Sequence, residues 1–146
     1  QIGLVFCTYL FGMVASPAAG ALADRLGRAP VLVGGVLLMS AGVLLTLVAP
    51  LAGVIAGIAV LTFGFFVAHA VASGWVGRLA RQSKGHASSL YLLAYYLGSS
   101  VLGSAGGWFW EYGRWPALVA FSMALLLGAL ALALALRRLA TSVGPR

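Results

Sequence analysis

The chain has very little charge. Only 8% of its 146 residues are charged and just two of them are acidic, whereas 62% are hydrophobic. A soluble domain has about a quarter charged residues, most of them on its surface. This sequence cannot build a water-facing surface of that kind, so its composition predicts a protein that folds in lipid.

Cysteine is almost absent. Cys7 is the only one, so no internal disulfide can form, and it lacks the spacing of a metal or redox site. We expect neither a metal nor a cofactor.

The start of the chain lacks an initiator methionine, and no charged region precedes its first apolar run, which is unlike a signal peptide. We therefore expect a segment of a longer protein.

Basic residues outnumber acidic ones, and the formal net charge is +7. In a soluble protein this excess would favour nucleic-acid binding. Here the basic residues lie in short gaps between apolar runs and form no patch among polar neighbours. We therefore expect the lipid bilayer as a partner, and no nucleic acid.

Uncharged stretches divide the chain into spans. The stretch between Arg28 and Arg78 is roughly twice the ~20 residues that cross a bilayer, and Pro50 is its natural break. Lipid offers no partner for an open backbone, so each span must be helical. The sequence predicts an all-α membrane protein with five transmembrane helices, at 2–22, 30–49, 52–74, 87–109 and 115–136.

The orientation follows from the basic residues. Eight of the nine fall on one side of a five-span zigzag: Arg25, Arg28, Arg78, Arg81, Lys84, Arg137, Arg138 and Arg146. Short basic loops face the cytoplasm. The sequence therefore predicts a multi-pass protein whose C-terminus is cytoplasmic.

Small residues predict how the helices pack. Residues without bulk at four-residue spacing let membrane helices approach closely. Gly12 and Ser16 have this spacing in the first span, and Gly53 and Gly57 have it in the third. Gly103 and Gly107, with Gly98 beside them, mark the fourth. Such helices suit a bundle whose parts rock against each other, and tight static packing explains them equally well.

His69 is the one histidine or charged residue inside a predicted span. It lies nine residues before Arg78, about 13 Å along a helix, and hence within the hydrocarbon. Such a residue is a candidate for substrate binding or a proton relay, because imidazole titrates near neutral pH. Ser73, one turn on, is its expected partner. The alternative is a neutral histidine that bonds a nearby carbonyl for packing.

Hydroxyls on the fourth span suggest a cavity wall. Tyr91, Tyr95 and Ser99 follow four-residue spacing, and buried hydroxyls need partners or water. Hydrogen bonds between helices are the alternative. No carboxylate lies within a span, so such a cavity suits amphipathic or uncharged solutes, and any proton-coupling carboxylate would lie elsewhere in the longer protein.

The segment between the first two spans is unusual. Asp24 is followed by Arg25 and Arg28 at a membrane boundary, with Gly20 and Gly27 on either side of it. Gly27 permits a positive φ in a short turn. The positive-inside rule explains the two arginines, but it does not explain the aspartate and both glycines at this spacing.

This segment resembles the signature of the major facilitator superfamily of secondary transporters, G-x-L-A-D-R-x-G-R. The matching residues are Gly20, Leu22, Ala23, Asp24, Arg25, Gly27 and Arg28. Ala29 departs from the pattern, which usually continues with a basic residue. The resemblance implies that the chain is part of a transporter bundle in a bacterial inner membrane. Such a transporter moves a small solute by alternating access, and some members couple this movement to protons.

The four spans and short basic tail after the signature resemble the C-terminal half, helices eight to twelve. The tract from Ser88 to Trp110 is similar to inner-membrane efflux members, although Gly103 stands where drug antiporters have proline. In this family the signature aspartate is thought to hold the cytoplasmic face closed against the other half. The resemblance thus implies that Asp24 belongs to a gate whose partner, the N-terminal half, lies outside the chain.

Two other classes of function compete with transport. An intramembrane hydrolase would need an oxyanion hole and a supporting acid, which the Ser73 and His69 pair lacks, so we expect no enzyme. A membrane sensor or scaffold could retain the same fold without transporting anything.

Overall fold

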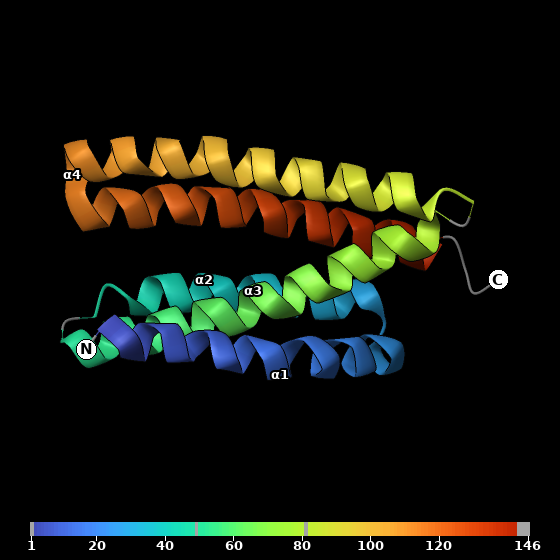
Figure 1. Ribbon diagram of the computed structural model, residues 1–146, viewed down its shortest axis with the longest axis horizontal. Helices are drawn as coiled ribbons and strands as arrows, with labels where there is room; N and C mark the ends of the chain where they lie inside the picture. Colours follow the sequence, from blue (N-terminus) through green and yellow to red (C-terminus); the bar gives the residue numbers. More distant parts are fainter. Residues whose placement is uncertain (1, 49, 81, 143–146) are drawn as a thin grey trace.

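The computed structural model describes residues 2–48, 50–80 and 82–142, and the side chains of those from 14 to 138. This part of the chain is helical and has no strand (Figure 1). The helices are α1 (Ile2–Leu26), α2 (Arg28–Leu45), α3 (Leu51–Leu79) and α4 (Lys84–Ser142). The prediction of an all-α fold is confirmed.

Three of the helices, α2, α3 and α4, are long and apolar enough to cross a membrane. Five crossings therefore remain a prediction. The helix α2 ends earlier than the predicted span 30–49, because the chain turns after Leu45. Thr46 closes this end by donating its hydroxyl hydrogen to the Val43 carbonyl at 2.6 Å.

The long helix α4 doubles back on itself at Arg114. This residue has φ 55° and ψ −150°, which interrupts the helix. We call residues 84–113 the first arm and 115–142 the second arm. Phe109 and Phe121 stack across the two arms with ring centroids 4.5 Å apart, so the arms lie side by side (Figure 1). The predicted fourth and fifth spans fall in these two arms.

The turn at Arg114 is fixed from outside α4 as well. The Trp115 indole N–H donates to the Thr46 carbonyl at 3.1 Å. That carbonyl lies just past the end of α2, where no following helical N–H is available to it. The bond therefore ties the start of the second arm to the end of α2.

The closest helix contact joins α2 to α3 through four glycines. Gly35 and Gly42 of α2 face Gly64 and Gly57 of α3. A Cβ on Gly42 would lie 2.7 Å from the Gly57 carbonyl oxygen, and one on Gly64 would lie 2.8 Å from the Gly35 oxygen. The two backbones are in direct contact, and any side chain at these positions would force them apart.

Of these four glycines, only Gly57 is one that the four-residue spacing singled out, where it is paired with Gly53. A Cβ on Gly98, Gly103 or Gly107 would meet nothing within 4 Å, so these residues make no close contact inside the described chain. Gly12 lies outside the residues whose side chains are described. The glycines in contact are seven residues apart on each helix, a spacing that returns to the same helix face after two turns.

The helix α1 packs mainly on α3. Its buried face is an alanine row, Ala15, Ala19 and Ala23, which meets Val67 and Val71 of α3. Gly20 lies off this face, since a Cβ there would meet nothing within 4 Å, and Ser16 is half-buried. The alanine row thus supplies a close approach of α1 to α3, and packing through Gly12 and Ser16 stays a prediction.

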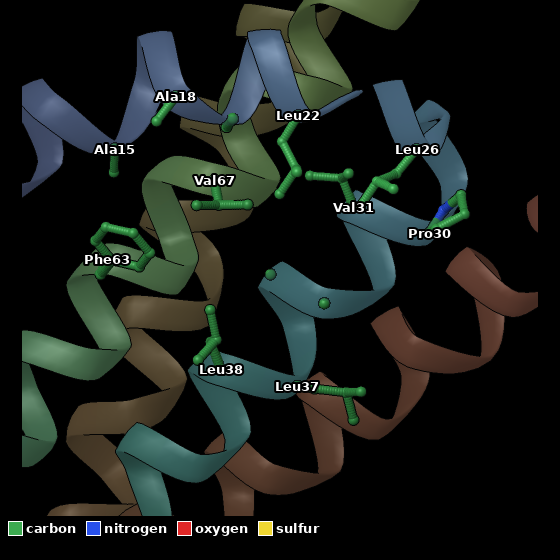
Figure 2. Close-up of a pocket in the computed structure, with 13 residues that line it drawn as sticks. Ala15, Ala18, Leu22, Leu26, Pro30, Val31, Leu37, Leu38, Phe63 and Val67 are labelled. Carbon is green, nitrogen blue, oxygen red and sulfur yellow. The ribbon is translucent and has the colours of Figure 1, made fainter. Parts of the chain in front are cut away.

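Between α1, α2 and α3 lies an apolar groove of about 540 Å³. Figure 2 shows its wall, with Ala15, Ala18 and Leu22 of α1 opposite Leu37 and Leu38 of α2. We call this cavity the apolar groove. Phe63 and Val67 of α3 form a third side of the groove.

Candidate functional site

Several helix ends meet at one end of the bundle, where α1 and α3 end and α2 and α4 begin (Figure 1). The described basic residues on these ends and on the last turns of the second arm are Arg25, Arg28, Arg78, Lys84, Arg137 and Arg138. We call this region the basic end. The signature segment lies here.

Gly27 makes the turn from α1 to α2. Its φ is 90°, a left-handed value that a side chain disfavours, so the predicted positive φ is confirmed. Its N–H donates to the Ala23 carbonyl at 3.0 Å, which closes the end of α1. The turn holds Asp24 and Arg28 on one face, four residues apart.

Asp24 accepts two charged hydrogen bonds at the same oxygen. Nη2 of Arg28 and Nη2 of Arg78 each lie 3.3 Å from its Oδ1. Arg78 is in the last turn of α3, so the carboxylate joins the α1–α2 turn to the end of α3. Arg25 is exposed beside them. The family resemblance placed the partner of Asp24 outside the chain, but Arg78 is a partner within it; a contact to a second half stays a prediction.

This ion-pair network is solvent-exposed. The Asp24 and Arg78 side chains are 59% and 64% exposed, whereas Arg28 is 26% exposed. Exposed pairs each contribute only about 0–1 kcal/mol. The network therefore adds little to folding stability, and it can break and re-form at small cost.

A second cluster lies in the helices away from the basic end. His69 of α3 and Tyr91 of α4 form a hydrogen bond, with Nδ1 and the phenol oxygen 3.0 Å apart. Phe65 stacks on the imidazole at a centroid distance of 5.4 Å, and the Tyr95 ring lies 5.1 Å from it. We call Phe65, His69, Tyr91 and Tyr95 the aromatic cluster. Sequence spacing named three of these four residues, and the fold brings them together.

The aromatic cluster lines a cavity of about 330 Å³. The rest of the wall is aliphatic and comes from α2, α3 and the second arm of α4. It consists of Leu32, Val36, Met39, Ala68, Ala72, Leu126, Ala129, Leu132, Ala133 and Leu136. Among the described residues, no charged side chain lines it, and His69 and the two phenols supply its polar side-chain groups.

Either tautomer of His69 can make this hydrogen bond. With neutral His69, the phenol can donate to Nδ1, or Nδ1–H can donate to the phenol oxygen. A protonated His69 donates from Nδ1, so the bond persists with its direction fixed. The contact therefore tolerates both protonation states of the imidazole.

Two predicted members do not join the cluster. The Ser73 hydroxyl donates to the Ala70 carbonyl at 3.2 Å, and the Ser99 hydroxyl donates to the Tyr96 carbonyl at 3.0 Å. Both hydroxyls are satisfied within their own helices, and neither residue lines the cavity. Helical spacing placed Ser73 near His69 along the chain, but the partner of His69 comes from another helix.

Sequence reasoning missed Phe65 and the role of Arg78. Phe65 stands four residues before His69, so the spacing that singled out the tyrosines could have found it. Nothing in the sequence signals the pairing of Arg78 with Asp24, because the two residues are 54 positions apart. Among the described residues, no group of histidine, cysteine and carboxylate side chains could hold a metal ion.

Comparison with known proteins agrees with the signature segment. The family model described as Major Facilitator Superfamily matches residues 1–146. The chain belongs to this superfamily. No solved structure matches it significantly.

Named relatives of this superfamily member are transporters and not enzymes. The chain is 45% identical over 126 residues to the uncharacterized MFS-type transporter YybF of Bacillus subtilis, covering 86% of the chain and 31% of that protein. It is 44% identical over 137 residues to the inner membrane transport protein YnfM of Escherichia coli, covering 94% and 33%. An uncharacterized transporter of Buchnera aphidicola is 39% identical over 138 residues, covering 94% and 33%. The chain thus spans about a third of the length of these relatives.

Proposed function

We propose that the chain is part of a secondary transporter that moves a small solute across a bacterial inner membrane by alternating access. Membership of the superfamily and the names of the relatives support transport. The observation that carries the proposal is the His69–Tyr91 bond, which joins α3 to α4 in the wall of an otherwise apolar cavity. Ligand sites of secondary transporters lie between helices near the membrane midplane.

The wall of the cavity limits the class of solute. It has aromatic faces, aliphatic side chains and hydroxyl and imidazole groups, but no charged side chain to neutralise a strongly charged solute. Burying an unpaired charge is costly. We propose amphipathic or uncharged solutes, exported from the cell, with His69 either binding the solute or relaying a proton.

The topology of the proposal follows the charges. The two arms of α4, with α1, α2 and α3, make five crossings, and the basic end faces the cytoplasm together with the C-terminus. The chain is the C-terminal half, and the partner is an N-terminal half of the same protein. The large apolar surface of the first arm, where Leu97 is 57% and Val101 is 64% exposed, is then covered by lipid or by that half.

Flux through the full-length protein tests the proposal. The protein is reconstituted in proteoliposomes, a pH gradient is imposed, and a panel of uncharged, amphipathic and strongly charged solutes is followed. We expect gradient-dependent flux of members of the first two groups. Flux confined to strongly charged solutes would contradict the proposed class, and no flux under any gradient would favour a sensor or scaffold.

Asp24 gives a second test, of gating. The Asp24→Asn variant loses the charge that holds Arg28 and Arg78, and we expect flux to fall about fivefold, the equivalent of one exposed pair of about 1 kcal/mol. The melting temperature should stay near that of the wild type because the pairs are exposed. Arg78→Gln should act like Asp24→Asn, and the double variant should be no worse than either.

The control for this test is Lys84→Gln, which removes a charge at the same end without touching the network. Its flux should equal that of the wild type. Wild-type flux in Asp24→Asn, or additive losses in the double variant, would rule out a gate built on the Asp24–Arg78 pair.

A further inference from the structure

A third cavity lies at the basic end, apart from the aromatic cluster. Its volume is about 450 Å³, and its walls come from the turn between α1 and α2, from α3 and from the second arm of α4. The lining residues are Leu26, Gly27, Arg28, Ala29, Pro30, Trp75 and Arg137. We call it the basic cavity. Two guanidinium groups from different helices and an indole thus border one hollow, and no acidic residue lines it.

The basic cavity adjoins the apolar groove. Leu26 and Pro30 line both, and Figure 2 shows them together at one end of the groove. Along α1 the groove extends from Ala15 to Leu26, about 16 Å at 1.5 Å per residue. Half of a hydrocarbon core of ~30 Å is about 15 Å, the depth that one acyl chain fills. The groove therefore has the length of a lipid tail.

From this arrangement we infer that the two cavities together form a binding site for one anionic phospholipid. Its phosphate lies in the basic cavity between Arg28 and Arg137, and an acyl chain follows the apolar groove between α1 and α2. Trp75 lies where glycerol and headgroup meet the hydrocarbon, the level at which indole rings are enriched.

The charges at the site favour an anion. Arg28 gives one nitrogen to Asp24, but a guanidinium has five N–H donors, so a phosphate oxygen can bind without breaking that pair. Gly27 has no side chain to cap the first turn of α2, and the helix dipole there adds to the attraction. Asp24 is the one acidic residue at the basic end, and it does not line the cavity.

The apolar part decides between a lipid and a free anion. Inorganic phosphate would fill the basic cavity alone and leave the groove unused. An anionic phospholipid satisfies the arginines and covers the leucine, alanine and phenylalanine side chains of the groove at once. Bound in this way, it would hold the α1–α2 turn that carries Asp24 against the end of the second arm.

Lipid retention by the full-length protein tests this site. The purified protein in detergent is given equal phosphatidylglycerol and phosphatidylcholine, and the lipids that stay bound are measured by native mass spectrometry. We expect wild type to prefer phosphatidylglycerol, and Arg137→Gln to lower this preference about fivefold, the effect of one arginine near an anionic headgroup. Gly34→Leu fills the groove, where a Cβ meets nothing within 4 Å, and should lower retention of the lipid.

Matched controls separate the site from general charge and bulk. Arg138→Gln removes the neighbouring charge, which does not line the basic cavity, and Gly128→Leu adds the same bulk at an open position of α4. Both should behave as wild type. The inference fails if the wild type does not prefer phosphatidylglycerol. It fails equally if Arg138→Gln and Gly128→Leu lower lipid retention as much as Arg137→Gln and Gly34→Leu do. It also fails if millimolar inorganic phosphate displaces the lipid while Gly34→Leu has no effect, since that outcome identifies a free-anion site.

Discussion

Replacing Gly42 with alanine is expected to cause a large loss of folded protein, because the added methyl group would meet the backbone of α3. The new Cβ would lie 2.7 Å from the Gly57 oxygen and from the Leu61 Cα, and closer still to the Leu61 nitrogen. All three are backbone atoms of α3, which cannot rotate away as a side chain does. The helices must separate, and the close contact between α2 and α3 is lost along its length.

The expected cost is at least the roughly 1–3 kcal/mol that overpacking of a core brings. It should appear as a lower melting temperature and a smaller monodisperse fraction of the full-length protein in detergent. Gly34→Ala is the matched control, since it adds the same methyl group to the same helix where nothing lies within 4 Å. Equal behaviour of the two variants would show that α2 and α3 do not meet through Gly42.

Replacing His69 with phenylalanine is expected to lower flux at least tenfold while the protein stays folded. The phenyl ring keeps the stack on Phe65, but Tyr91 loses its hydrogen-bond partner and the cavity loses its imidazole. Two hydrogen bonds are lost, one to Tyr91 and one to the solute, and at about 0.5–1.5 kcal/mol each they reach the ~1.4 kcal/mol of a tenfold change in solute affinity. Flux in proteoliposomes and the melting temperature are measured together.

Two further variants separate the roles of His69. His69→Gln can still hydrogen-bond Tyr91 but cannot take up a proton, so a proton relay predicts solute binding without response to the pH gradient. Tyr96→Phe, on the helix of Tyr91, is the control, because the Tyr96 side chain is 64% exposed and lies outside the cavity. Unchanged flux in His69→Phe would assign the histidine to helix packing.

Family membership could be predicted from nine residues, because the segment from Gly20 to Arg28 carries a specific pattern. The helical class followed from composition, since lipid excludes open backbone. The break at Pro50 and the turn at Gly27 followed from the chemistry of proline and of a positive φ. The candidates His69, Tyr91 and Tyr95 followed from polarity in an apolar context.

The contacts between helices could not be predicted from the sequence. Four-residue spacing singled out Gly57 together with Gly103 and Gly107, yet the last two lie in open space among the described residues. Nothing in that spacing marked Gly42 as the residue that Gly57 touches. The spacing of small residues marks a face that can be approached, but not which helix approaches it. Ser73 likewise looked like the partner of His69, although its hydroxyl bonds its own helix.

The sequence by itself determined that the protein folds in lipid, which family it belongs to, that it is helical and where the signature segment lies. Each of these depends on local composition and spacing. The tertiary structure alone decided that Asp24 meets Arg78, that His69 meets Tyr91, and that a basic cavity adjoins an apolar groove. These pairings depend on how α1, α3 and α4 lie against one another. Helix faces of similar apolar character leave that arrangement undetermined until side-chain shape and close backbone contact select one of the alternatives.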